Sequence, residues 1–424
     1  MTLRQHFLAT AALFALATPA FAIDLEFYFP VAVGGKAAET VQALTDNYMK
    51  AHPDVKISAI YTGSYVDTTA KAITAARGGN PPELIIAGAA DMFAFIDEEL
   101  VVAFDDLVSE ADKAAWLGGF FPAFMANSQA DGKTWGIPFQ RSTPVLYWNK
   151  DAFKAAGLDP EKGPANWAEM VEMGKKLTVK DAGGAVKQYG VQIPSSGFPS
   201  WLWSGIVAGA GGKMANAAGN ETYFNSPEAI AALEAIVALS KTDGVMAPGI
   251  LEWGSTPKAF FEGQAAMIWT TTGNLTNVRT NAPFPFGVGF LPGLKQNGAP
   301  TGGGNFYLMK GNNEAELKAA VDFVKWATSP EQAANWTIAT GYVAPRADVW
   351  ETPVMKDYVA GFPQAAVARD QLQYAIAELT VFEGPKVTQI INSALEAAIT
   401  GQKSPKEALD AAQADADAIL KAYR

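Results

Sequence analysis

Apolar residues recur along the first hundred positions at two different spacings. Residues 25–29 and 84–87 are short, mainly apolar runs, and residues 55–61 are apolar at every second position, which is the spacing of a strand. Residues 36–52 are apolar at the three-to-four-residue spacing of an amphipathic helix, and residues 66–76 are predicted to form a second helix. Helices that alternate with strands in this way pack as a mostly parallel sheet with helices on both faces. The first part of the chain is therefore predicted to be α/β.

Later helices are marked by residues that cap helix starts. Asn166 precedes Glu169, and Ser404 precedes Glu407, at the spacing of a capping box. A further apolar strand is predicted at residues 265–269.

The chain is too long for a single hydrophobic core, so two lobes are expected. Two apolar stretches flanked by turn residues, 136–148 and 286–291, are the predicted passages between them. Lobe 1 is predicted to comprise residues 23–140 and 292–338, and lobe 2 residues 141–291 and 339–424. Each lobe is then discontinuous in sequence, and a hinge at the passages would let the lobes close over a ligand.

Residues 1–22 have the pattern of a secretory signal peptide. A positive charge at Arg4 precedes an apolar run at residues 7–17, and Ala20-Phe21-Ala22 has the small-x-small form of a cleavage site. The alternative interpretation, a first membrane helix, is disfavoured because the run is too short to span a bilayer. The chain has no cysteine to carry a lipid, so the mature protein is expected to start near Ile23 and to be free outside the cytoplasm.

Composition excludes several classes of function. Loss of Arg4 with the leader takes the formal net charge from −11 to −12, whereas nucleic-acid-binding proteins need a basic surface. With no cysteine, and His52 as the one histidine after the leader, catalysis by thiolate or imidazole and the usual zinc sites are nearly excluded. No G-x-S-x-G, H-E-x-x-H or P-loop sequence occurs. We therefore expect no enzyme activity, no cofactor and no metal site.

Four stretches resemble the family 1 extracellular solute-binding proteins, the group that includes the maltodextrin-binding proteins. They are residues 144–151 (Pro-Val-Leu-Tyr-Trp-Asn-Lys-Asp), 166–169 (Asn-Trp-Ala-Glu), 260–267 (Phe-Phe-Glu-Gly-Gln-Ala-Ala-Met) and 341–345 (Gly-Tyr-Val-Ala-Pro). The resemblance runs over nearly the whole mature chain. It implies a two-lobed periplasmic binding protein fold of type II, in which each lobe is a mainly parallel sheet flanked by helices. It also implies a role as the solute-binding component of an ABC importer.

Within this family the chain looks most like the periplasmic sn-glycerol-3-phosphate-binding proteins, through residues 61–65, 139–144 and 145–160. The implied ligand is sn-glycerol 3-phosphate or a related glycerophosphodiester. The implied partners are the inner-membrane permease subunits with their cytoplasmic ATPase, and the binding protein itself is expected to be a monomer. The resemblance carries the ligand contacts onto Tyr65, Ser142, Gly303 and Tyr342, with Thr271 in place of a serine and Trp167 in place of a cleft tryptophan.

Two positions depart from the pattern of the glycerol-phosphate binders. Ala89 stands where those proteins have an acidic residue that holds the glycerol hydroxyls, and Thr388 where they have an arginine that holds the phosphate. Asp91 lies near enough in sequence to replace the acid. The candidates to replace the arginine are Arg141, which is preferred because it adjoins Ser142, then Arg346 and Lys386.

The residue types at these positions suit a small polyol phosphate. Tyrosine and tryptophan offer flat apolar faces with a polar edge, and a loop at residues 302–304, all glycine, would bring backbone N–H groups close to an oxyanion. Trp201 and Trp203 would point to the same side of a strand but to different faces of a helix, and Trp201 is our candidate for the cleft.

Two other functions stay open at this point. An uncharged sugar, polyol or oligosaccharide is the alternative ligand, favoured by the aromatic content and by the residues at positions 89 and 388. An exported glycoside or phosphodiester hydrolase that uses two carboxylates is the alternative of another class. No pair of acidic residues in the sequence has a recognisable catalytic setting, which disfavours the hydrolase.

Overall fold

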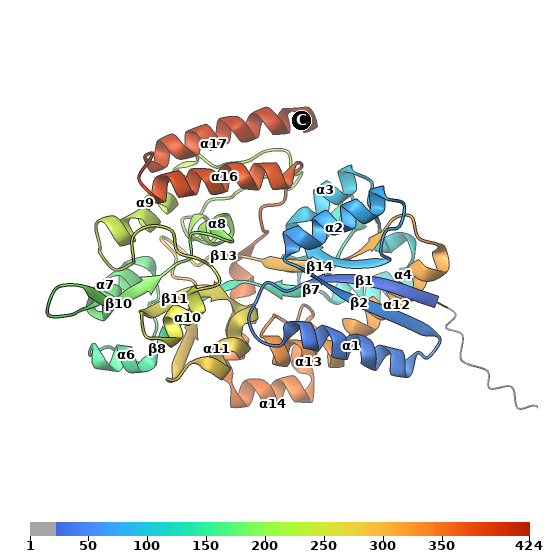
Figure 1. Ribbon diagram of the computed structural model, residues 1–424, viewed down its shortest axis with the longest axis horizontal. Coiled ribbons are helices and arrows are strands. Elements are labelled where there is room, and N and C mark those ends of the chain that lie inside the picture. The colour runs from blue at the N-terminus through green and yellow to red at the C-terminus, as the bar shows by residue number, and fades with distance from the viewer. Residues whose placement is uncertain (1–22) are drawn as a thin grey trace, which may run out of the picture.

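The computed structural model describes residues 23–424, which form two lobes side by side (Figure 1). Lobe 1, at the right of Figure 1, is built on a six-stranded sheet, and lobe 2, at the left, on a five-stranded sheet. The predicted signal peptide, residues 1–22, lies outside the described residues. Within residues 23–424, no helix combines the length and the apolar character needed to cross a membrane.

The sheet of lobe 1 has the strand order β2-β1-β3-β14-β4, and β7 also pairs with β14. Its strands are β1 (Ile23–Pro30), β2 (Val55–Gly63), β3 (Leu84–Gly88), β4 (Val101–Val102), β7 (Ile137–Ser142) and β14 (Gly302–Met309). The three strands predicted from the apolar pattern are thus confirmed, and β1 pairs in parallel with both β2 and β3. The two predicted helices are confirmed as α1 (Ala37–Ala51) and α2 (Tyr65–Arg77).

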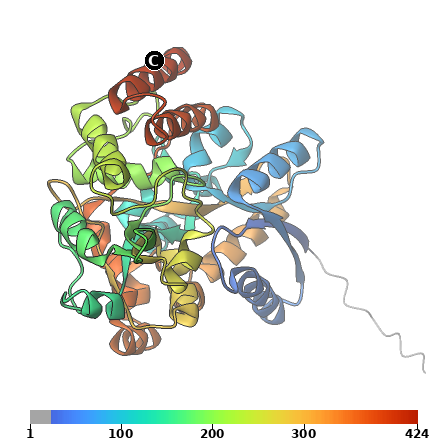
Figure 2. The same ribbon diagram turned by 60° about the vertical axis from the view of Figure 1, so that its left-hand side comes forward.

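Alternate residues of these strands face two separate hydrophobic cores. Phe27, Phe29 and Ile86 pack with α1 and α12 (Glu314–Ala327) on one face of the sheet. Ile85 and Ala87 pack with α2 and α3 (Met92–Asp97) on the other face. Figure 2 shows α1 and α2 on opposite sides of the sheet, so the predicted cover on both faces is confirmed.

The sheet of lobe 2 has the strand order β12-β8-β11-β10-β9 and is also covered on both faces. Its strands are β8 (Pro144–Asn149), β9 (Val179–Lys180), β10 (Val186–Gln192), β11 (Ala265–Thr271) and β12 (Phe286–Gly289). Leu146 and Trp148 of β8 face a core that includes α7 (Trp167–Leu177), α8 (Pro199–Gly209) and α9 (Pro227–Lys241). Val145 and Tyr147 face the opposite way, towards α10 (Thr256–Phe261) and α11 (Leu275–Asn281).

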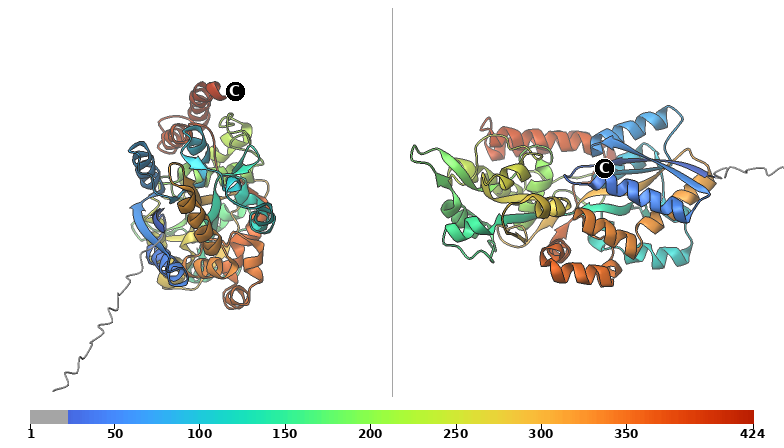
Figure 3. Two further views of the ribbon diagram at one scale, coloured as in Figure 1. Left: turned by 90° about the vertical axis from the view of Figure 1, so that its right-hand side faces the viewer. Right: turned by 60° about the horizontal axis from the view of Figure 1, so that its bottom comes forward.

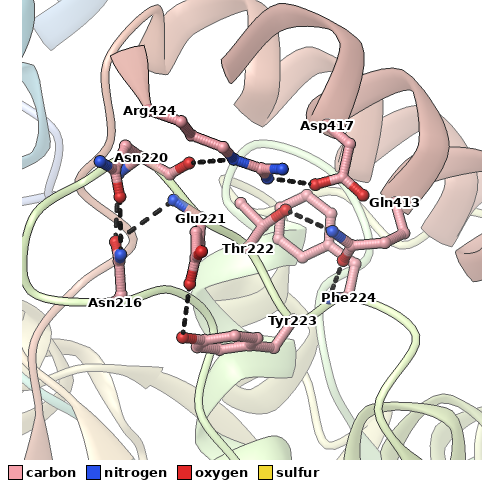
Figure 4. Close-up of polar contacts among 9 residues, drawn as sticks. All are labelled: Asn216, Asn220, Glu221, Thr222, Tyr223, Phe224, Gln413, Asp417 and Arg424. Atoms are coloured by element: carbon pink, nitrogen blue, oxygen red, sulfur yellow. Dashed lines mark hydrogen bonds and ion pairs between the residues drawn. The ribbon is translucent and has the colours of Figure 1, made fainter. Parts of the chain in front are cut away.

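Two C-terminal helices, α16 (Gly384–Ile399) and α17 (Pro405–Leu420), pack on lobe 2, and α17 begins at the predicted capping box of Ser404 and Glu407. Gln413 of α17 accepts a hydrogen bond from the Phe224 N–H (2.6 Å), as Figure 4 shows. At the end of the chain, Tyr423 donates to Asp97 of lobe 1 (3.2 Å), and Figure 3 shows this end lying beside lobe 1.

The remaining helices are α4 (Glu110–Ala115), α5 (Pro122–Met125), α6 (Lys150–Ala155), α13 (Pro330–Thr340), α14 (Pro353–Gly361) and α15 (Val367–Gln371). The remaining strands and 3-10 turns are β5 (Gln129–Ala130), β6 (Lys133–Thr134), β13 (Ala299–Pro300), β15 (Ala375–Ile376), η1 (Ala89–Asp91), η2 (Phe104–Asp106), η3 (Leu117–Gly119), η4 (Thr272–Asn274), η5 (Ala347–Glu351), η6 (Pro363–Ala366), η7 (Leu372–Tyr374) and η8 (Lys421–Tyr423).

Three segments carry the chain between the lobes. The first is the step from β7 to β8 at Thr143, inside the predicted passage 136–148. The second is residues 290–301, because β12 lies wholly in the sheet of lobe 2 and the chain crosses only after it. The predicted passage 286–291 was therefore placed too early. The third begins after α13, because Trp350 packs with Phe124 of lobe 1 whereas Phe362 already packs with Tyr147 of lobe 2, and it ends with residues 375–383, which lead into α16. The residue boundaries of the two lobes stay a prediction.

The sheets are mixed rather than mainly parallel. In lobe 1, β14 is antiparallel to β3, with Gly304 opposite Gly88. In lobe 2, three of the four strand pairings are antiparallel. A strand such as β14 that enters from the other lobe starts at the cleft edge, where the parallel strands of its own lobe end, so it has to run against them. The two-lobed type II fold is as predicted, and only the strand directions need this correction.

Two buried asparagines join the three crossing segments. Asn305 of β14 accepts a hydrogen bond from Arg141 of β7 (3.1 Å) and donates one to the Asn127 carbonyl (2.8 Å). The Asn127 side chain accepts from the Thr301 hydroxyl and from the Glu378 N–H, both at 3.1 Å, and donates to the Glu378 carbonyl (3.0 Å). One connected set of hydrogen bonds therefore fixes all three crossings relative to one another.

Asn127→Ala is expected to lower the free energy of unfolding by about 1–3 kcal/mol, because it leaves the Glu378 N–H without a partner and the Thr301 hydroxyl with only a long contact to the Ile376 carbonyl (3.5 Å). Asn281→Ala is the matched control, since Asn281 is exposed and its amide bonds only to Asn277 one turn away. The control should change the free energy by less than about 0.5 kcal/mol. Urea unfolding measures both variants, and equal effects would show that Asn127 has no special role.

Candidate functional site

A cavity of about 580 Å³ lies between the two lobes. Two of its walls are helices from different lobes whose lining residues have the same spacing. The residues from α2 are Tyr65, Val66, Thr69, Ala70 and Ile73, and those from α16 are Gly384, Pro385, Thr388, Gln389 and Asn392. Side chains four residues apart lie on one face of a helix, so each helix presents one continuous face to the cavity.

A third wall is aromatic and belongs to lobe 2. Trp201 of α8 donates its indole N–H to the Thr301 carbonyl (2.9 Å), which fixes the ring against a crossing segment. Trp253 meets Phe198 and Trp201 edge-on, with ring centres 5.1 and 6.0 Å apart. Because α8 is a helix, Trp203 turns away into the core of lobe 2, and Trp201 is the tryptophan of this pair that lines the cavity.

The ends of two strands and the segment after α13 form the floor of the cavity. Ser142 is the last residue of β7, Thr271 the last residue of β11, and Tyr342 follows α13. Seven of the ten predicted contact residues line this one cavity, namely Tyr65, Asp91, Ser142, Trp201, Thr271, Gly303 and Tyr342. Their contact with a ligand stays a prediction.

The glycines at 302–304 form the start of strand β14 rather than the predicted loop. Gly302 pairs with Ser142 and Gly303 with Arg141 in the sheet of lobe 1. Gly303 has a φ of +97°, and a Cβ there would lie 1.8 Å from the Gln140 carbonyl oxygen, so another residue would be strained and would clash. A Cβ at Gly302 would lie 2.5 Å from the Trp201 indole nitrogen. Gly302 therefore lets the two lobes approach closely at the floor, and Gly303 lets β14 pair with β7 within lobe 1.

Tyr65 and Tyr342 meet at the inner end of the cavity. The Tyr65 hydroxyl donates to the Gln140 side chain (2.8 Å), and the Tyr342 ring stacks on Trp336 with ring centres 5.7 Å apart. Burial raises the pKa of Tyr342 to about 12 and that of Tyr65 well above its usual value. Both phenols are therefore neutral at physiological pH, and because Tyr65 donates its proton to Gln140, its oxygen is left to accept a hydrogen bond from a ligand.

Two carboxyl groups line the cavity, and only one of them was predicted. Asp91 accepts a hydrogen bond from the Thr69 hydroxyl (2.9 Å), and burial raises its pKa to about 6. Burial raises the pKa of Glu378 to about 8 against a smaller opposing effect of Arg141, and its Oε2 is buried without a hydrogen-bond partner. No cluster of three or more possible metal ligands (His, Cys, Asp or Glu) occurs among residues 23–424.

The structure does not bring the other three predicted residues into the cavity lining. Trp167 packs against Trp269 in the core of lobe 2, with ring centres 5.9 Å apart. Arg346 is already bound, to Asp348 (2.7 Å) and to the Trp116 carbonyl (2.7 Å). It therefore has little capacity left for an anion.

Arg141 lies in the layer beneath the floor. It is fully buried, its Nη1 donates to Asn305, and its guanidinium lies 5.0 Å from the Phe124 ring centre. Its Nε and Nη2 have no partner in the structure, and burial lowers its pKa to about 10. Arg141 thus stays charged at neutral pH but is separated from the cavity by the residues that line it.

Sequence reasoning missed Glu378, Trp253 and Phe198. Glu378 follows the two-residue strand β15 and belongs to the third crossing, for which the apolar pattern gave no signal. Thr388 does line the cavity, from α16, whereas Ala89 is fully buried and its neighbours Ala90 and Asp91 line the cavity instead. Both departures therefore fall at or beside the site.

Comparison with known proteins gives one family and a consistent set of relatives. The family model described as "Bacterial extracellular solute-binding protein" matches residues 43–364. The sn-glycerol-3-phosphate-binding periplasmic protein UgpB of Pectobacterium atrosepticum is 28% identical over 428 residues, which cover 95% of this chain and 92% of that protein. The protein of the same name from Salmonella typhimurium is 29% identical over 414 residues, covering 92% and 91%.

Solved structures share the fold along nearly the whole chain. UgpB of Mycobacterium tuberculosis in complex with glycerophosphocholine has a TM-score of 0.82 at 22% identity, and the match covers 94% of this chain and 98% of that one. A maltose-bound T. maritima protein has a TM-score of 0.80 at 22% identity, covering 94% and 100%. At these identities the likeness establishes the two-lobed fold.

Glu378→Gln is expected to stabilise the ligand-free protein at pH 8 and to leave it unchanged at pH 4. The carboxyl ionises near 4.5 when unfolded but near 8 when folded, so between these values the folded state holds a proton that the unfolded state loses. Stability of the natural protein therefore falls as the pH rises from 4.5 to 8. The amide removes this loss, worth at least about 1 kcal/mol at pH 8. Urea unfolding at both pH values tests this, and a variant less stable at pH 8 would contradict it.

Proposed function

The chain belongs to the bacterial extracellular solute-binding protein family, and we propose that it is the periplasmic component of an ABC importer for a glycerophosphodiester or for sn-glycerol 3-phosphate. The observation that carries the proposal is that Tyr65, Ser142, Tyr342 and four other predicted contacts line one cavity between two lobes. Small-molecule sites are typically concave and lie between domains. The names of the relatives, sn-glycerol-3-phosphate-binding proteins, support the same ligand class.

The phosphate group is proposed to bind neutral donors at the floor. The hydroxyls of Ser142 and Thr271 lie there. The first turns of α8 and α16 also line the cavity, although the Ser200 N–H is bonded to Asn392 (3.3 Å) and the Lys386 and Val387 N–H groups to the Glu383 carbonyl (2.9 and 3.1 Å). These helix ends therefore contribute mainly their partial positive charge, which favours an anion.

The lining favours a phosphodiester over a phosphomonoester. Within residues 23–424, no lysine, arginine or histidine lines the cavity, and Thr388 stands at the position of the usual arginine. A monoester carries close to two negative charges at neutral pH, whereas a diester carries one. Burying charge without a paired cation is costly, so the singly charged diester suits this site better.

An uncharged sugar is the second candidate ligand. The aromatic wall of Phe198, Trp201 and Trp253 offers the flat apolar faces that a sugar ring can pack against, and a neutral ligand needs no cation. Residues from both lobes line the cavity, so either ligand would be enclosed when the lobes close. We propose that the closed form is what the permease of the importer recognises.

A thermal-shift panel on the purified protein tests the proposed ligand class. Glycerophosphocholine, glycerophosphoglycerol, sn-glycerol 3-phosphate, maltose and glucose are compared at equal concentration. We expect the glycerophosphodiesters to raise the melting temperature most, since a ligand at a hundred times its dissociation constant adds about 2.7 kcal/mol of stability. A shift with a sugar and none with any glycerophosphate compound would reject the proposal in favour of the second candidate.

Tyr65→Ala is expected to weaken binding of the ligand found in that panel by at least about tenfold, or about 1.4 kcal/mol, because the side chain lines the cavity and donates to Gln140. Tyr61→Ala is the matched control, since Tyr61 lies in the same lobe and is 56% exposed. Titration calorimetry on folded variants measures both. Unchanged affinity in Tyr65→Ala would remove Tyr65 from the site.

A further inference from the structure

The C-terminal residues connect lobe 2 to lobe 1 outside the three crossing segments. Tyr423 follows α17, which packs on lobe 2, and its hydroxyl donates to Asp97 of α3 in lobe 1 (3.2 Å). Asp97 is exposed, and within residues 23–424 this is the one hydrogen bond that its side chain makes. The contact joins the lobes without a covalent connection, so it can break when the lobes separate.

Three aromatic rings lie in a row beside this hydrogen bond. The Tyr423 ring stacks on Phe382 of the third crossing, with ring centres 4.5 Å apart and 6° between the planes. Phe382 in turn meets Phe93 of α3, with ring centres 4.9 Å apart. Phe382 therefore packs both against the core of lobe 2 and against the core beside α2 and α3 of lobe 1. Paired aromatic rings attract one another beyond the effect of area burial, so the row favours the arrangement in which the lobes touch.

The C-terminal side of this contact is held firmly on lobe 2. The Asn220 amide donates to the Tyr423 carbonyl (2.9 Å). Arg424 donates to the Asn220 carbonyl (3.1 Å), as Figure 4 shows. The Phe382 N–H donates to the carbonyl of Gly219 in the same loop as Asn220 (2.9 Å). The rings of Phe382 and Tyr423 are therefore expected to move with lobe 2 when the lobes separate.

The contact lies at one edge of the cavity. Phe93 comes two residues after Asp91, and Phe382 comes two residues before Gly384, and both Asp91 and Gly384 line the cavity. A Cβ at Gly219 of lobe 2 would lie 2.7 Å from the Phe93 ring, so the two lobes approach closely here. The four side chains that make the contact do not themselves line the cavity. They can therefore change the separation of the lobes without touching a ligand.

We propose that Phe93, Asp97, Phe382 and Tyr423 form a clasp that stabilises the closed arrangement of the lobes, so that the C-terminus sets affinity through closure. Opening the lobes separates the residues of lobe 1 from those of lobe 2 and exposes apolar ring surface to water, which is unfavourable. Affinity for a ligand of the closed form is proportional to the fraction of the protein that is closed. The clasp therefore raises affinity by the same factor for every such ligand, and this effect rests on the proposed function.

Small-angle scattering and titration calorimetry on Tyr423→Ala test the clasp. The substitution removes the hydroxyl and the stacked ring but leaves the backbone contact with Asn220. Without ligand, we expect a larger radius of gyration than that of the natural protein, and with saturating glycerophosphocholine the same radius. Affinity for glycerophosphocholine should fall roughly three- to tenfold, and affinity for sn-glycerol 3-phosphate by the same factor.

Tyr223→Ala is the matched control. Tyr223 lies on lobe 2, is 36% exposed, and its hydroxyl donates to Glu221 of the same loop (3.4 Å), as Figure 4 shows. Its removal should change neither the radius nor the affinities. Gly219→Ala is a second variant, because the added Cβ would press on the Phe93 ring, and it should open the lobes as Tyr423→Ala does. Urea unfolding of each variant checks that it is folded.

The outcomes separate this inference from the proposed function. A larger radius without ligand, or an equal loss of affinity for the two ligands, would support the clasp. No change in either measurement would overturn it, and so would losses that differ between the ligands, because the residues would then act on the ligand itself. If neither ligand binds, the proposed function fails, and the radius of the ligand-free Tyr423→Ala protein then decides the clasp alone.

Discussion

The hydrogen bonds of Asn127 and Asn305 are the constraint on which the rest of the structure depends. Three chain segments cross between the lobes within a small buried region, and every buried backbone or side-chain polar group there needs a partner. Two amide side chains meet this need by bonding to all three crossings at once. The crossings beneath the cavity are therefore fixed by a polar network rather than by apolar packing alone.

This network also explains the position of Arg141. A buried guanidinium needs hydrogen bonds and favourable electrostatics; Asn305 of β14 accepts one hydrogen bond from it, and the Glu378 carboxyl of the third crossing raises its pKa against the larger effect of burial. The arginine next to Ser142 in sequence is thereby held below the cavity. Because neighbouring residues of a strand point to opposite faces, Ser142 and Arg141 cannot both face the ligand.

The sequence allowed prediction of most elements but only part of the site. Apolar spacing identified α1, β1, β2 and β3, and capping residues identified the start of α17, because these signals are local. Strand direction in β14 and the exact second crossing depend on how the lobes meet, which no local pattern encodes. The contacts of Tyr65, Ser142 and Tyr342 came from resemblance to relatives, and so position 378, which does not belong to that pattern, was missed. Arg346 was misplaced for a related reason, since its sequence position does not reveal its partner Asp348.

The two departures at positions 89 and 388 gain a common physical meaning from the structure. Losing one acid and one arginine leaves the net charge of the site unchanged, but it changes where the charged groups lie. The carboxyl groups that line the cavity are now Asp91 and Glu378, and burial raises their pKa values to about 6 and about 8, so Glu378 is mainly protonated at neutral pH. The remaining cation, Arg141, lies beneath the floor. A doubly charged phosphate would meet only neutral donors and helix N-termini, and a helix end at an exposed site contributes about 0.3–1 kcal/mol. A diester brings one negative charge rather than two, so the same changes that weaken a site for sn-glycerol 3-phosphate favour a diester.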